Sequence, residues 1–174
     1  MLRLLVIAAF LTASTPALAV KVGQKVPNFR LKDSKGKSYS LHSFKKKVLI
    51  FWYEGKNSKE QNRWLKKKLK KIFDGNLKGI KAKHWESVGI ANFQETAVPN
   101  FLINMVIKSE IKKTGAIILC DRKGVMMKKW GFRNGRSNIF MVDKKRRLRW
   151  KTSGPLGKKA GKRFIRLLRR LTRE

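Results

Sequence analysis

The stretch that decides the fold is Val48–Leu69, VLIFWYEGKNSKEQNRWLKKKL. It opens with Val48–Tyr53, a nearly continuous apolar run that is typical of a central strand covered on both faces. A polar loop follows, and beyond it Leu65, Leu69 and Ile72 recur at the spacing of one stripe of an amphipathic helix. The stretch therefore predicts a buried strand, a loop and a helix in that order, which indicates an α/β fold.

The loop between this strand and helix contains no cysteine. Lys56 and Lys59 have the spacing of a C-x-x-C pair, the dithiol that redox sites place at a helix N-terminus. Dithiol chemistry is therefore excluded at this position. Ser58 is a good N-cap residue, and Gln61 three positions later completes the pattern of a capping box, so we expect the helix to start here.

The expected helix start is also a candidate anion site. A helix N-terminus presents unpaired backbone N–H groups and a partial positive charge. Lys56, Asn57, Ser58 and Lys59 would add cationic and polar groups, so phosphate, sulfate or carboxylate is the class of ligand indicated. The alternative, which the abundance of lysine throughout the chain favours, is an ordinary capped helix with solvated lysines.

Cys120 is the only cysteine, so the chain cannot form an internal disulfide. It ends an apolar run, residues 115–120, that predicts a buried strand. A free cysteine in such a run is usually a small hydrophobic residue, whereas a reactive thiol needs a lowered pKa. We therefore expect a structural role for Cys120. The competing hypothesis is an antioxidant or reductase that uses Cys120 together with a resolving thiol from a partner.

Residues 1–19 have the pattern of a secretory signal peptide. Arg3 is the basic start, Leu4–Leu11 the apolar core, and Ala17–Ala19 an A-x-A cleavage site. The apolar run is shorter than the roughly 20 residues that span a bilayer, and an uncleaved anchor is the alternative. We expect cleavage after Ala19, a periplasmic or secreted product, and a single domain over residues 20–174.

Charge is the second strong signal. The chain has 44 Lys and Arg against 10 Asp and Glu, a formal net charge of +34. Such a surface favours polyanionic partners, namely lipopolysaccharide, anionic lipid or nonspecifically bound nucleic acid, and an acidic protein is a further candidate. The densest region is 144–174, where Glu174 is the only acid, and a second lysine-rich region spans residues 66–71.

The remaining elements follow from the same kinds of pattern. Turn residues at Asp33–Gly36 predict a hairpin within residues 22–44. We expect strands at 87–93 and 116–120, a helix at 99–112, and a closing hairpin formed by 137–142 and 148–150. A last helix at 158–172 has a regular apolar face made by Ala160, Phe164, Leu167, Leu168 and Leu171.

Arginines occupy much of the rest of that last helix: Arg163, Arg166, Arg169, Arg170 and Arg173. A basic amphipathic helix can lie on an anionic membrane surface. If its apolar face packs on a sheet instead, the arginines face solvent or a polyanion. We favour packing on the sheet and keep these arginines as a candidate polyanion or membrane-surface site.

Metal and cofactor sites are not indicated. His42 and His84 are the only histidines and belong to no Cys/His cluster, so we predict no metal site. The sequence Gly36-Lys37-Ser38 matches the end of a phosphate-binding P-loop, but Leu31 stands where the first glycine is required. We therefore predict no cofactor.

A family resemblance rests on short segments along the chain: Val22–Phe29, Val48–Tyr53, Cys120–Val125 and Trp130–Phe132. Together they resemble the landmarks of the thioredoxin-like, peroxiredoxin-related superfamily. Within it the chain is most similar to the small periplasmic YtfJ family, through Gly55–Asn62 and the hairpin Asn138–Trp150. That family likewise has a signal peptide and no C-x-x-C.

The resemblance implies a thioredoxin-like three-layer sandwich with a mixed central sheet and flanking helices. It also places Ser137 where redox relatives carry a cis-proline beside their thiols. We therefore do not expect this protein to act on disulfide substrates. The catalytic residues of those relatives cannot be assigned to this chain by position. The sequence thus predicts an exported, non-redox binding or accessory protein of the bacterial envelope. The alternatives are the Cys120 enzyme and a basic protein that binds lipopolysaccharide or anionic membranes.

Overall fold

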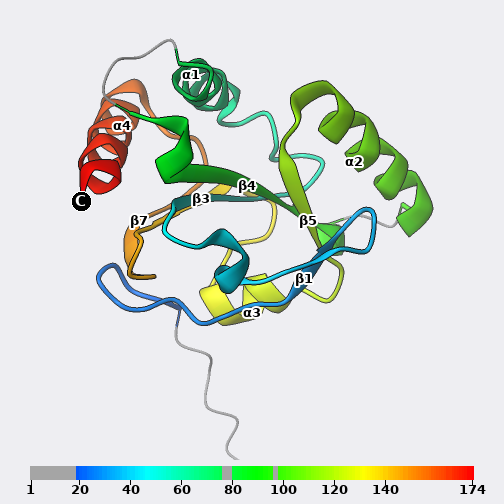
Figure 1. Ribbon diagram of the computed structural model, residues 1–174. Coiled ribbons are helices and arrows are strands. Elements are labelled where there is room, and N and C mark those ends of the chain that lie inside the picture. Colours follow the sequence, from blue (N-terminus) through cyan, green and yellow to red (C-terminus); the bar gives the residue numbers. More distant parts are fainter. Residues whose placement is uncertain (1–18, 76–79, 96–97) are drawn as a thin grey trace, which may run out of the picture.

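The computed structural model describes residues 19–75, 80–95 and 98–174 (Figure 1). Their strands are β1 (Leu31–Asp33), β2 (Ser38–Tyr39), β3 (Val48–Glu54), β4 (Trp85–Asn92), β5 (Ile117–Asp121), β6 (Asn138–Val142) and β7 (Leu148–Ser153). The α-helices are α1 (Arg63–Phe73), α2 (Asn100–Thr114), α3 (Val125–Trp130) and α4 (Lys158–Arg173), with short 3-10 helices at Leu41–Phe44, Ala82–His84 and Phe93–Glu95. The predicted signal peptide lies outside the described residues, apart from Ala19. Within the described ranges, no helix has the length and apolar character needed to cross a membrane.

The described strands form one mixed sheet in the order β2-β1-β5-β4-β3-β6-β7. β3, β4 and β5 are parallel, whereas β6 pairs antiparallel with β3 and β1 antiparallel with β5. Val48–Tyr53 of β3 is buried throughout, as its continuous apolar run predicted. The register between β3 and β6 aligns Tyr53 with Asn138. The end of β3 therefore lies beside the start of β6, and this juxtaposition positions the candidate site.

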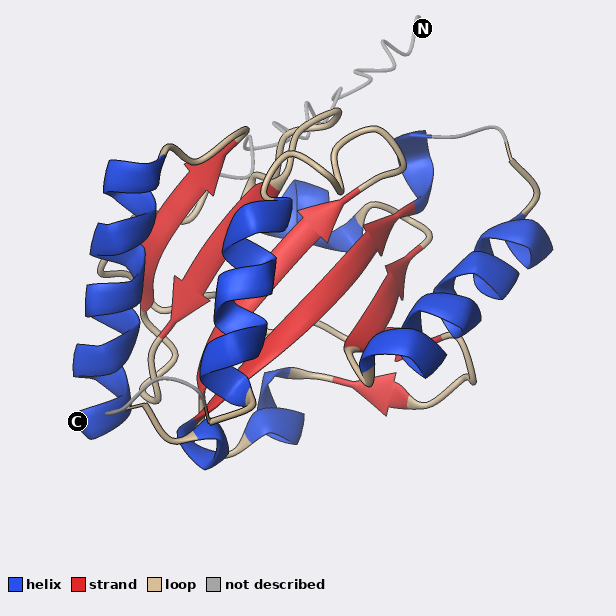
Figure 2. Cartoon of the chain, turned by 90° about the horizontal axis from the view of Figure 1, so that it is seen from above, coloured by secondary structure: helices blue, strands red, loops and turns tan. Residues whose placement is uncertain are grey.

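Helices cover both faces of the sheet and give it three layers (Figures 1 and 2). Because side chains alternate along a strand, Ile50 of β3 packs with residues of α1 and α4, whereas Phe51 packs with residues of α3. α2 lies on the same side of the sheet as α1 and α4, over β5 (Figure 2). The α/β three-layer sandwich with a mixed sheet, expected from the sequence, is confirmed.

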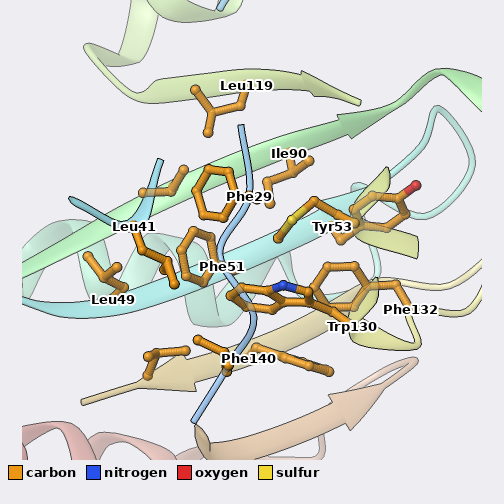
Figure 3. Packing of buried hydrophobic residues seen from close by; sticks show 14 of the residues in the cluster. Phe29, Leu41, Leu49, Phe51, Tyr53, Ile90, Leu119, Trp130, Phe132 and Phe140 are labelled. Carbon is orange, nitrogen blue, oxygen red and sulfur yellow. The ribbon is translucent and has the colours of Figure 1, made fainter. Parts of the chain in front are cut away.

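The face covered by α3 has an aromatic core (Figure 3). The ring of Phe51 contacts Phe29 and Trp130 edge-to-face, with centroids 5.7 and 5.1 Å apart. Phe132 connects this cluster to Tyr53 and Phe140, at centroid distances of 4.6 and 4.5 Å. Such pairs contribute about 0.5–1.5 kcal/mol each beyond the area they bury. Tyr53, directly before the candidate site, is therefore held firmly in the sheet.

The boundaries of several elements differ from the prediction. The hairpin within residues 22–44 is the short pair β1–β2, whose turn is closed by Asp33 Oδ1 accepting from the backbone N–H groups of Lys35 and Lys37. α3 was not predicted. It begins after Gly124, where the buried carboxylate of Asp121 accepts from the first N–H groups of the helix at 2.7 and 2.8 Å.

The last helix packs on the sheet, as predicted. Phe164, Leu168 and Leu171 of α4 are buried, and the helix runs beside α1 (Figure 2). The two helices approach at Gly161, where a Cβ atom would overlap with the indole of Trp64. The indole is fixed by its own hydrogen bond, since Trp64 Nε1 donates to the Leu156 carbonyl at 3.2 Å.

Gly161→Ala should lower the free energy of unfolding by about 1–3 kcal/mol, because the added methyl group overpacks the contact with Trp64. This cost outweighs the roughly 1 kcal/mol that alanine gains over glycine in a helix. Equilibrium unfolding in urea measures the change. The same substitution in a Trp64→Leu background is the control and should be nearly free of cost; an equal cost in both backgrounds would show that the contact is not responsible.

Candidate functional site

The loop after β3 differs from its prediction. α1 begins at Arg63, so the prediction of Ser58 as its N-cap, with Gln61 completing a capping box, is wrong. Residues 56–62 form turns instead, in which the N–H groups of Ser58 and Lys59 both donate to the Gly55 carbonyl. The Ser58 hydroxyl is buried and accepts from Gly55 N at 3.0 Å. These hydrogen bonds pair the polar groups of the loop with one another, and α1 begins only after the loop, at Arg63.

Asn62, the N-cap residue of α1, is the centre of a buried hydrogen-bond network. Its Nδ2 donates to Ser137 Oγ at 2.9 Å and to the Gly154 carbonyl at 3.1 Å. Its Oδ1 accepts from Leu156 N at 2.8 Å. The side chain therefore caps no helix N–H group. It joins the loop after β3 to the residue before β6 and to the connection between β7 and α4.

Glu54, Lys66 and Gln61 extend this network. Ser137 Oγ donates to Glu54 Oε1 at 2.6 Å, and Gln61 Oε1 accepts from Ser137 N at 3.0 Å. Lys66 Nζ donates to Glu54 Oε2 at 2.5 Å and to the Lys59 carbonyl at 2.8 Å. The polar side chains between the end of β3 and the start of β6 are thus paired with one another.

The carboxyl of Glu54 has a raised pKa. Burial is the main cause, because the side chain is only 10% exposed, and the charge of Lys66 and the hydrogen bonds from Lys66 and Ser137 oppose it in part. Buried carboxyls of this kind often mark functional sites. Here the adjacent hydroxyl of Ser137 is fully buried, so the arrangement offers no accessible nucleophile.

The four residues of the predicted anion site lie together in the turns that follow β3. Lys56, Asn57 and Lys59 are exposed, whereas Ser58 is buried. The N–H groups of Ser58 and Lys59 are already donated to Gly55, so they are not the free donors of a helix N-terminus. Anion binding at this turn stays a prediction that depends on the two exposed lysines.

Cys120 lies in β5, as predicted, and is buried against Phe93 and Ile107 under α2. β4 separates its strand from β3 in the sheet. Burial raises the pKa of the Cys120 thiol above its ordinary value, and the charge of Arg122 only partly opposes this. Since the thiolate is the reactive form of cysteine, this environment favours a structural role.

The arginines of α4 border a surface hollow of about 430 Å³, lined by Arg166, Arg169, Arg170, Arg173 and Glu174. Arg163, on the same helix, is exposed but does not line it. Arg169 Nε is shielded from solvent and has no hydrogen-bond partner in the part of the chain that the structure describes. The structure therefore brings four of the five predicted arginines together around one shallow, open hollow, where Glu174 forms an ion pair with Arg170 at 3.9 Å.

Sequence reasoning missed Glu54 and Asn62 as members of this network. It considered Gln61 only as part of a capping box, Lys66 only as part of a lysine-rich region, and Ser137 only as the replacement of a proline. The peptide bonds of the described residues are all trans, including the one before Ser137. The partners of Asn62 lie 75 to 94 positions away in the chain, so no local pattern could reveal them. The one available signal was the expected neighbourhood of the β3 and β6 strands.

Comparisons with known proteins agree with the geometry. A family model described as AhpC/TSA family matches residues 22–151. A proposed protein disulfide isomerase of Bacteroides thetaiotaomicron is similar in structure, with a TM-score of 0.67 and 16% identity over 89% of this chain and 92% of its own. No curated protein matches the chain.

Two further solved structures show the same likeness. A proposed thiol:disulfide interchange protein DsbE of Chlorobium tepidum has a TM-score of 0.65 and 14% identity, covering 88% of this chain and 99% of its own. A proposed thioredoxin of Neisseria meningitidis has a TM-score of 0.63 and 16% identity, covering 83% and 89%. At such identities the likeness shows the fold alone, and that fold is thioredoxin-like, as the resemblance in sequence implied.

Glu54 should make stability depend on pH. Its pKa in the folded protein is raised above the ordinary 4.5, so between the two values the folded state holds the proton more tightly than the unfolded chain. Relative to Glu54→Gln, the wild-type protein should therefore lose stability as pH rises through the folded pKa. Urea unfolding of both proteins between pH 4 and pH 8 measures the difference. A wild-type protein that gains stability over this range, relative to the variant, would mean that the attraction of Lys66 dominates.

Proposed function

The chain belongs to the AhpC/TSA family, and we propose that it is a member without thiol chemistry that binds polyanions through the outer surface of α4. We place it in the bacterial envelope as a binding or accessory protein rather than an enzyme. The observation that carries the proposal is the cluster of Arg166, Arg169, Arg170 and Arg173 around one surface hollow, with Arg166, Arg170 and Arg173 exposed.

An anion in this hollow would meet the exposed guanidinium groups of Arg166, Arg170 and Arg173. Their N–H groups would donate charge-assisted hydrogen bonds to an oxygen of phosphate or carboxylate. Arginine is also the side chain best matched to such groups, since its planar guanidinium can donate two parallel hydrogen bonds. The net charge of +34 would attract a polyanion over a longer range and speed its association.

The absence of thiol chemistry is supported by the candidate site. The loop after β3 carries Lys56 and Lys59 at the dithiol spacing, and the space beside it holds the paired side chains of Asn62, Glu54 and Ser137. The one cysteine is buried in β5. Neither place offers an accessible thiolate.

The envelope setting is supported by the sequence. Residues 1–19 have the basic start, apolar core and cleavage triplet of a signal peptide. Together with the missing dithiol and the closing hairpin, this pattern favours the YtfJ-like group within the family. In that setting the polyanion would be lipopolysaccharide or anionic lipid, and binding of nucleic acid in vitro would reflect nonspecific electrostatics.

Removal of three exposed arginines should weaken polyanion binding. Arg166→Gln/Arg170→Gln/Arg173→Gln should lower affinity for lipopolysaccharide and for a short single-stranded DNA probe about tenfold or more, and should reduce the slope of log affinity against log salt by about 2–3. Fluorescence anisotropy over a salt series measures both quantities.

The matched control removes three exposed lysines from α1, Lys67→Gln/Lys68→Gln/Lys71→Gln, and so changes the net charge equally. This control should lose clearly less affinity than the arginine variant. Equal losses in the two variants would mean that binding follows total charge and that the α4 hollow is no site.

The second candidate function is a thiol-dependent antioxidant or oxidoreductase. Its support is that the similar solved structures carry names of thiol and disulfide chemistry. Under our proposal, wild-type protein and Cys120→Ala should reduce hydrogen peroxide at the same background rate with dithiothreitol as reductant, and should bind polyanions equally. Turnover that disappears in Cys120→Ala would establish the thiol enzyme instead.

A further inference from the structure

The outer face of α2 is apolar and exposed. Phe101 and Met105 are each 63% exposed and Val106 is 61% exposed, with Leu102 beside them. The inner face of the same helix packs on β5 through Ile103, Ile107 and Ile111. A surface helix normally presents polar side chains on the face that is turned away from the sheet. A contiguous apolar patch on such a face marks an interaction surface.

Cationic side chains flank this patch. Lys108 and Lys112 of α2 are exposed along the following turns of the helix. Arg122 adjoins the helix, because its guanidinium donates to Asn104 Oδ1 at 2.9 Å and lies 4.5 Å from the ring centroid of Phe93. Glu110 is exposed on the same turns and offsets one of these charges, so Lys108, Lys112 and Arg122 leave a net positive charge beside the protruding apolar groups.

We propose that the outer face of α2 docks on an anionic lipid bilayer. The four apolar side chains would enter the boundary between headgroups and acyl chains, while Lys108, Lys112 and Arg122 would lie among anionic headgroups. Charge argues against a second copy of the chain as the occupant, because two copies with a net charge of +34 repel each other. A bilayer with anionic lipid gives both an apolar phase and compensating charge.

This inference goes beyond the polyanion binding proposed for α4. α2 and α4 lie at opposite ends of the helix layer, with α1 between them (Figures 1 and 2). The α4 surface needs only charge, whereas docking by α2 also needs Phe101 and its neighbours. Each proposal can therefore fail while the other stands.

The test compares two variants of the full chain, purified as the cell processes it, on vesicles of 30% phosphatidylglycerol and 70% phosphatidylcholine. Phe101→Ser/Met105→Ser should lower the partition coefficient at least about tenfold, because two large apolar side chains no longer leave water. Val22→Ser is the matched control, since Val22 is 60% exposed and outside α2; it should change partition less than about twofold. Both variants should bind the DNA probe like the wild type.

A second measurement locates the contact between α2 and the vesicle without depending on a loss of binding in a variant. An environment-sensitive nitrobenzoxadiazole label on Met105→Cys, in the Cys120→Ala background, should shift to the blue and brighten on these vesicles, whereas the same label on Val22→Cys should not. Equal responses at the two positions would overturn the proposal. So would equal partition of the double variant and the wild type, absence of wild-type binding to the vesicles, or a wild-type dimer that Phe101→Ser/Met105→Ser converts to a monomer in sedimentation velocity.

Discussion

The hydrogen bonds of the buried Asn62 side chain are the constraint on which the arrangement of the site depends. A buried side-chain amide needs hydrogen-bond partners, since each donor or acceptor left unpaired lowers the free energy of unfolding by about 1–3 kcal/mol. Asn62 finds them in Ser137, Gly154 and Leu156, so the three bonds form together only when the loop after β3, the start of β6 and the entry to α4 are all in place. The side chain thus couples the folding of three distant parts of the chain.

The thioredoxin-like fold is present here without a dithiol in the loop after β3. The carboxyl end of a central strand and the start of its antiparallel neighbour still meet, because the register of Tyr53 with Asn138 requires it. The groups that meet there are Glu54, Lys66 and Ser137, and they bind one another. Binding functions are then left to the outer surfaces of the helices, where charge and exposed apolar groups accumulate: the arginines of α4 and the outer face of α2.

The fold was largely predictable, because its signals are local. The continuous run Val48–Tyr53 and the apolar periodicity of 158–172 identified β3 and α4, and the structure confirms both. The start of α1 was not predictable from the pattern Ser58-x-x-Gln61. A capping box and a buried turn use the same residue types, and the choice between them depends on Ser137 and Leu156, which lie far away in the sequence.

The candidate site was predictable only in part for the same reason. Lys56 and Lys59 could be recognised from spacing, and Cys120 from its apolar strand, whereas the network around Asn62 comes from tertiary contacts alone. The patch on α2 was not predicted because residues 101–107 are apolar on both faces of the helix, and a sequence pattern does not show which of them the sheet covers.

The most direct test of the closed network is amide hydrogen exchange, followed by NMR, at the two backbone groups that donate to it. Ser137 N donates to Gln61 and Leu156 N donates to Asn62. The account predicts that both amides exchange only with global unfolding, at the same free energy as the central amides of β3. Exchange of either amide through a local opening, at a much lower free energy, would show that the loop opens on its own and would contradict the account.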